Sequence, residues 1–149
     1  MPGTIVVGVD GSPASLAALR FAVEEAQLRD WSVVAVHAWL YLPPAPLAEP
    51  GLVPAPQVDV PGTLEALRDG ADAEFQAALD AAFAEDPPVE IERKLVEGDA
   101  AEVLEQESKK ADLVVVGSRG HSGIRAVLLG SVSRHVVDHA PCPVVVVKP

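Results

Sequence analysis

The segment 117–131, GSRGHSGIRAVLLGS, combines glycine, serine and basic side chains in a spacing that suits an anionic ligand. Gly117 directly follows the apolar run LVVV, and a glycine at a strand end lets a ligand approach the backbone and permits a positive φ. Gly130 and Ser131 stand before a segment of helical periodicity. Ser131 can cap that helix, and the free N–H groups behind it can bind an anion.

Further donors gather around the same segment in a chain that is otherwise strongly acidic. The N–H groups of Val132 and Ser133 and the hydroxyl of Ser133 would join the helix start, and Arg119, His121 and Arg125 make the loop locally cationic. A glycine-rich turn before a capped helix explains the same residues equally well, so the pattern alone leaves both interpretations open. Neither the dinucleotide fingerprint G-x-G-x-x-G nor the P-loop string G-x-x-x-x-G-K-[ST] is present.

Two other groups of polar residues resemble catalytic or metal sites in their composition. A hydrolase could be assembled from Asp10, Ser118, His121 and Asp138. We reject it because no G-x-S-x-G elbow occurs and nothing positions a base. His135 and His139 have the i, i+4 spacing of metal ligands but lack the H-E-x-x-H glutamate, so they are interpreted as helix surface.

Composition bounds the class of protein. The chain has 149 residues, 49% of them apolar, which predicts one domain over residues 1–149. The net charge of −11 argues against binding to nucleic acid or to an anionic membrane. The one cysteine, Cys142, is predicted to be a buried structural thiol. No long apolar run or signal pattern is seen, so a cytoplasmic location is expected.

Strands and helices alternate along the chain. Buried parallel strands are predicted at 4–9 and 112–116, a further strand at 31–39, a half-exposed edge strand at 89–95, and an apolar strand at the sheet edge over 143–148. Helices are predicted after the Ser12-Pro13 cap, over 63–85, from the Asp99 capping box to about 110, and after residue 131. A long proline-rich loop, 40–61, follows the second strand. The order predicts an α/β domain with a parallel sheet and helices on both faces.

Such sheets bind ligands beyond the carboxyl ends of their strands, where the strand order reverses. The glycine segment leaves the fourth strand at that edge. The spacing G-x2-G-x9-G-[ST] there resembles the ATP-binding signature of universal stress proteins. The opening IVVGVDGSPAS, the stretch VHAW and the close GSVSRHVVDHAPCPVVVVKP are also similar to that family. The resemblance implies a flavodoxin-like, Rossmann-like three-layer fold with strand order 3-2-1-4-5.

The resemblance also implies an ATP site. The first strand end would lie along the adenosine, with Asp10 near the ribose or near a phosphate-bound Mg²⁺. The backbone of Ala38 would meet the adenine edge, and the two glycine pieces would wrap the ribose and hold the phosphates. The implied ATP-binding residues are Gly8, Val9, Asp10, Ala38, Val116, Gly117, Arg119, Gly120, His121, Ser122, Gly130, Ser131, Val132 and Ser133.

The resemblance leads to three expectations about function. ATP would be a regulatory ligand in a stress response, hydrolysed slowly or not at all because no clear general base stands beside the phosphates. The alternatives are an ATP-hydrolysing or nucleotidyl-transferring enzyme of a related fold, and an interaction module without nucleotide. The apolar edge strand 143–148 would pair with its copy in a homodimer. Gly117→Ala is expected to weaken ATP binding by crowding the ligand.

Overall fold

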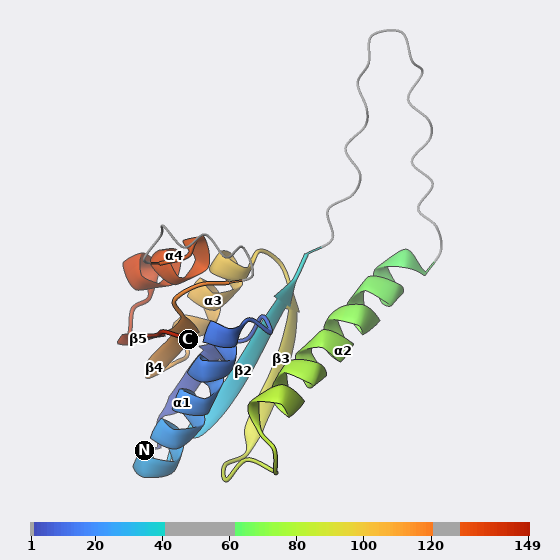
Figure 1. Cartoon of the computed structure of the whole chain (residues 1–149). Coiled ribbons are helices and arrows are strands. Elements are labelled where there is room, and N and C mark those ends of the chain that lie inside the picture. Colours follow the sequence, from blue (N-terminus) through green and yellow to red (C-terminus); the bar gives the residue numbers. More distant parts are fainter. Residues whose placement is uncertain (1, 41–61, 121–128) are drawn as a thin grey trace, which may run out of the picture.

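The computed structural model describes residues 2–40, 62–120 and 129–149. Five parallel strands form one sheet in the order β3-β2-β1-β4-β5, as predicted (Figure 1). The strands are β1 (Thr4–Gly8), β2 (Ser32–Trp39), β3 (Ile91–Glu97), β4 (Leu113–Gly117) and β5 (Val144–Val147). The helices are α1 (Pro13–Arg29), α2 (Thr63–Ala82), α3 (Ala100–Ser108) and α4 (Ser131–His139).

Alternation along the strands builds two separate cores, one on each face of the sheet. Ile5 and Val7 of β1 pack with the buried side chains of α1 and α2, whereas Val6 between them packs with α3 and α4. Successive side chains of a strand point to opposite faces, so a strand buried on both faces must be apolar throughout. This requirement explains the valine runs of the inner strands.

Local signals in the sequence fix two of the helix starts. Ser12 is the N-cap of α1, and its hydroxyl accepts a hydrogen bond from the Ser15 N–H at 3.3 Å. Asp99 is the N-cap of α3, and its carboxylate accepts from the Glu102 N–H at 3.3 Å. Both caps confirm the predictions, because each side chain satisfies a backbone donor that the helix cannot.

The predicted boundaries were less accurate than the predicted elements. The edge strand predicted at 89–95 runs instead over Ile91–Glu97, and the helix predicted over 63–85 ends at Ala82. β3 does lie at an edge, pairing with β2 alone, and β5 lies at the other edge with four partly buried valines. The predicted loop 40–61 falls almost wholly outside the described residues. Within the described part of the chain, no helix is long and apolar enough to cross a membrane.

Candidate functional site

A pocket lies at the carboxyl edge of the sheet, where β1 and β4 end and the strand order reverses. β1 pairs with β2 on one side and with β4 on the other, so the strand order reverses at β1. The connections that leave β1 and β4 therefore run to opposite faces of the sheet, and a crevice remains between them. Fifteen residues line it: Gly8, Val9, Asp10, Ser15, Val36, Ala38, Ala100, Leu104, Gly117, Arg119, Gly120, Gly130, Ser131, Val132 and Ser133.

The structure brings most of the predicted site residues together around this pocket. Eleven of the fourteen lie among the lining residues; the other three are Val116, His121 and Ser122. Val116 is 3% exposed and its side chain belongs to the core beneath α3 and α4. His121 and Ser122 lie outside the described residues. The predicted residues that the structure describes thus converge on one pocket.

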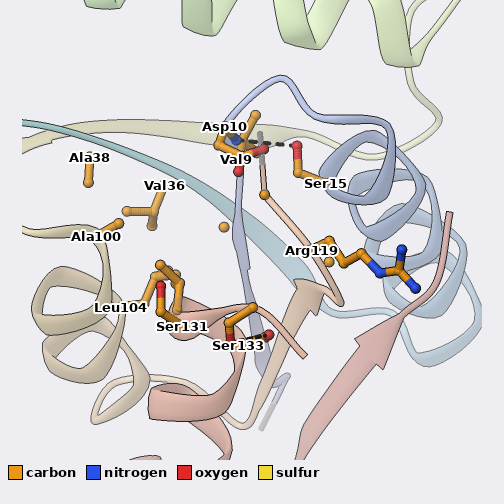
Figure 2. Close-up of a pocket in the computed structure, with 15 residues that line it drawn as sticks. Val9, Asp10, Ser15, Val36, Ala38, Ala100, Leu104, Arg119, Ser131 and Ser133 are labelled. Carbon is orange, nitrogen blue, oxygen red and sulfur yellow. Dashed lines mark hydrogen bonds between the residues drawn. The ribbon is translucent and has the colours of Figure 1, made fainter. Parts of the chain in front are cut away.

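The pocket has an apolar side and a polar side (Figure 2). Val36, Ala38, Ala100 and Leu104 gather on the apolar side, contributed by β2 and α3. The start of α4 provides the polar side with Ser131 and Ser133. An arrangement of this kind suits a ligand with a flat apolar ring at one end and an anionic group at the other.

The start of α4 carries no side-chain cap. Its N-cap is Gly130, with φ −69° and ψ 170°, so the sequence-based assignment of Ser131 as the cap was wrong. Ser131 is instead the first residue of the helix. The Ser133 hydroxyl donates back to the carbonyls of Gly130 at 3.0 Å and of Ser118 at 3.2 Å. Among the described residues, the first N–H groups of α4 have no hydrogen-bond partner, and they lie beside a pocket at the positive end of the helix dipole.

The glycine at the end of β4 has a packing role in addition to the ligand-binding role that was predicted for it. The φ of Gly117 is not positive. A Cβ built on it would lie 2.7 Å from the carbonyl carbon of Ala14 and 2.8 Å from the backbone nitrogen of Ser15. Gly117 is thus required for close packing of β4 against the first turn of α1. Gly117→Ala would therefore cause a collision inside the fold, and the crowding of a ligand by the same substitution stays a prediction.

Asp10 is held by the loop between β1 and α1. One oxygen of its carboxylate accepts hydrogen bonds from both the N–H (2.8 Å) and the hydroxyl of Ser12, and its own N–H donates to the Ser15 hydroxyl at 3.2 Å. Its other oxygen faces Gly120, where an added Cβ would stand 3.0 Å away. A glycine at 120 therefore leaves room beside this carboxylate, and the loop and the glycine turn come together at the pocket.

Arg119 is positioned differently from the prediction. It lines the pocket, but its guanidinium points away from the apolar group and toward the space beside α1 (Figure 2). Its Nε is buried without a hydrogen-bond partner among the described residues. The backbone of Arg119 is therefore the part that borders the pocket in this conformation, and the predicted wrapping of phosphates would need a different rotamer.

Sequence reasoning missed four lining residues, Ser15, Val36, Ala100 and Leu104. Ser15 lies in the first turn of α1, a few residues after Asp10, and Val36 lies in β2, two residues before Ala38. Ala100 and Leu104 come from α3, which no motif connects with the site. A Cβ added to Gly8 would stand 2.8 Å from the Leu104 Cδ1, so this glycine and this leucine are fitted to each other. Apolar residues of this kind carry no distinctive sequence signal.

Comparison with known proteins defines the class to which this fold and pocket belong. The profile of the universal stress protein family matches residues 1–148. The chain therefore belongs to the universal stress protein family. Universal stress protein Rv2623 of Mycobacterium tuberculosis is 37% identical over 144 residues, which are 97% of this chain and 44% of that protein. The chain thus spans less than half the length of this relative.

Solved structures agree with the fold. Universal stress protein UspA from Lactobacillus plantarum is 28% identical, with a TM-score of 0.69 over 97% of each chain. A universal stress protein solved in complex with cAMP is also 28% identical, with a TM-score of 0.59 over 97% of this chain and 95% of its own. The second structure is of a relative that binds an adenine nucleotide.

Proposed function

We propose that this chain binds ATP in the pocket at the carboxyl edge of the sheet and uses it as a regulatory ligand. The observation that carries the proposal is the start of α4, which lines a pocket with an apolar side and whose first N–H groups have no partner among the described residues. Helix starts of this kind bind phosphate through N–H donors and the helix dipole. The cAMP complex of a relative supports adenine as the base.

The two sides of the pocket indicate how the nucleotide would lie. Adenine would contact the apolar side near Ala38 and Leu104, and the phosphates would reach Gly130 and the first turn of α4. Ser131 would add its hydroxyl close to the phosphates, and Ser133 would contribute its N–H, because its hydroxyl donates to the carbonyls of Gly130 and Ser118. His121, Ser122 and the Arg119 side chain remain part of the proposed site from the family resemblance rather than from their placement.

Mg²⁺ would accompany the phosphates in this proposal. Magnesium is usually held by one or two carboxylates together with phosphate oxygens and water. Asp10 offers one carboxylate at the pocket, with one oxygen accepting from Ser12 and the other facing the glycine turn. The donor set therefore fits a metal that is bound mainly through the nucleotide.

Slow or absent hydrolysis follows from the residues that line the pocket. Among the described lining residues, Asp10 is the sole carboxylate, and none is a histidine or a lysine. Its hydrogen bonds from Ser12 favour a structural role over that of a general base. An ATP-hydrolysing or nucleotidyl-transferring enzyme is the alternative, and it would require a base from the residues that the structure does not describe.

One experiment separates these functions. Gently purified protein is denatured, the released nucleotide is identified by chromatography, and a second sample is incubated with ATP and Mg²⁺ while ADP is followed for hours. Bound ATP that stays ATP supports the proposal. Rapid ADP formation would favour the enzyme, and the absence of bound nucleotide together with no ATP uptake by calorimetry would favour a nucleotide-free module.

We also propose a homodimer that pairs β5 with its copy. β5 hydrogen-bonds to β4 on one side, and no described strand covers its other side. An apolar edge strand of this kind promotes association unless it is covered. Sedimentation equilibrium at micromolar concentration should give twice the monomer mass of 15.5 kDa. A monomer at that concentration would contradict the pairing without affecting the ATP proposal.

A further inference from the structure

Three metal-ligating side chains meet on the helical face opposite α1 and α2. Glu105 lies on α3, and His135 and His139 lie one turn apart on α4. One ligand atom from each of the three lies within 4.8 Å of the other two. The cluster borders a shallow groove along α4 and is separate from the lining residues of the nucleotide pocket.

The two helices are already joined through this cluster. His135 Nε2 lies 2.7 Å from Glu105 Oε2, and both side chains are about 30% exposed. The sequence-based interpretation of the histidine pair as helix surface therefore holds only for His139, which is exposed. Glu105 is thirty residues from His135, so the i, i+4 histidine spacing alone could not reveal this third ligand.

His139 is oriented by its own helix. Its Nδ1 lies 2.8 Å from the carbonyl oxygen of His135 and donates to it, since a carbonyl can only accept. The neutral ring then carries its lone pair on Nε2. A metal-binding histidine usually donates its other ring N–H to a carbonyl or a carboxylate in this way. The hydrogen bond thus prepares Nε2 of His139 for a metal.

We propose that Glu105, His135 and His139 form a binding site for a divalent transition-metal ion that bridges α3 and α4. Two imidazoles and one carboxylate suit Zn²⁺, Ni²⁺, Co²⁺ or Cu²⁺ rather than Mg²⁺ or Ca²⁺, which prefer oxygen ligands alone. Water would complete the coordination, because the groove is open along α4.

Binding requires modest movements of side chains. Ligands about 2.1 Å from a tetrahedral Zn²⁺ stand about 3.4 Å apart. The 2.7 Å pair of His135 and Glu105 must therefore open by about 0.7 Å. His139 is exposed, so a small tilt of its ring toward the metal displaces no core side chain.

The carboxylate is available as a ligand near neutral pH. The hydrogen bond from His135 lowers the pKa of Glu105, and partial burial opposes this effect without reversing it. The nearby positive charges of His135, His139 and Lys109 lower that pKa further, each less strongly than the hydrogen bond. A bound metal ion would take the place of the histidine charges as the positive partner of the Glu105 carboxylate.

The test uses the untagged, nucleotide-free chain titrated with ZnCl₂ by calorimetry, and with CoCl₂ by visible absorption. We expect one Zn²⁺ per chain and the d–d bands of Co²⁺ in a site of low coordination number. Glu105→Gln, His135→Gln and His139→Gln should each weaken Zn²⁺ binding by about tenfold or more, as loss of a ligand or its support does.

The matched control is Asp138→Asn, which removes a carboxylate from the same groove but not from the cluster. Its Zn²⁺ affinity should equal that of the natural chain. The proposal is overturned if the natural chain does not bind Zn²⁺ at millimolar concentration. It is also overturned if all three cluster variants, shown to be folded by circular dichroism, bind as the natural chain does.

Discussion

Replacing Gly130 by aspartate should stabilise the nucleotide-free protein and weaken ATP binding. Gly130 is the N-cap of α4, and its φ and ψ lie in the extended region that aspartate adopts readily at a cap. A Cβ there has its nearest neighbours at 3.6 Å, in Arg119 and Ser118, so it fits without displacement. The new carboxylate would accept from the N–H groups that the structure leaves uncapped.

The two effects have different sizes. An aspartate cap gains a few tenths of a kcal/mol over glycine, and its charge at the helix start adds roughly 0.3–1 kcal/mol. The expected total is about 1 kcal/mol, which for a chain of this size raises the Tm by about 2–4 °C. Against a phosphate about 4 Å away, the same charge costs about 4 kcal/mol under surface screening. ATP affinity should therefore fall by about a thousandfold, since each 1.4 kcal/mol is about a factor of ten.

The assay combines urea unfolding of nucleotide-free protein with calorimetric titration of ATP. Gly130→Asn is the matched control, because it supplies a similar cap without the charge, and it should stabilise less and weaken ATP binding less. If Gly130→Asp left ATP affinity unchanged in a folded protein, the phosphates would not lie at the start of α4. If it lowered stability, the reasoning about the uncapped helix start would be wrong.

Three further outcomes are expected. Gly117→Ala should lower the free energy of unfolding of the nucleotide-free protein, measured in urea, by about 1–3 kcal/mol, because the new Cβ meets the backbone of Ala14. If the stability were unchanged, the proposed packing role of Gly117 would be wrong. The hydrogen bond from His135 lowers the pKa of Glu105 below its ordinary 4.5. The ionised Glu105 should therefore stabilise the fold at pH 6, and this stabilisation should be lost as the pH falls below about 4.5. Glu105→Gln should lack this stabilisation at every pH. If the natural chain were still more stable than Glu105→Gln at pH 3, the expectation would be contradicted. Burial, and less strongly the charge of Asp112, raises the pKa of the Cys142 thiol. Cys142 should therefore react with iodoacetamide more slowly than a free thiol at pH 8, because the thiolate is the reactive form. An equal rate of reaction would contradict this expectation.

The fold was largely predictable because its signals are local. Valine runs buried on both faces identify inner parallel strands, and the charged alternation in β3 identifies an edge strand. Ser12 and Asp99 mark helix starts because capping depends on neighbours within three residues. Boundaries such as the start of β3 depend on pairing with β2, which residue types alone do not determine.

The site was predictable where it follows from strand ends and glycines, and less so where it depends on packing. Gly120 and Gly130 could be placed because they flank predicted elements, but the contact of Gly117 with α1 depends on how helix and sheet approach each other. Leu104 enters the pocket because α3 packs over β1 and β2. The direction of the Arg119 side chain is a rotamer, which the residue type leaves undetermined.

The end of β4 and the start of α4 are fastened to each other directly. The Ser118 carbonyl accepts from the Gly130 N–H at 2.7 Å and from the Ser133 hydroxyl at 3.2 Å. The main-chain bond therefore links the end of the sheet to the start of the helix directly. A displacement of β4 at Ser118 would be passed to the N–H groups at the start of α4, and a ligand held at the helix start would in turn restrain the end of β4.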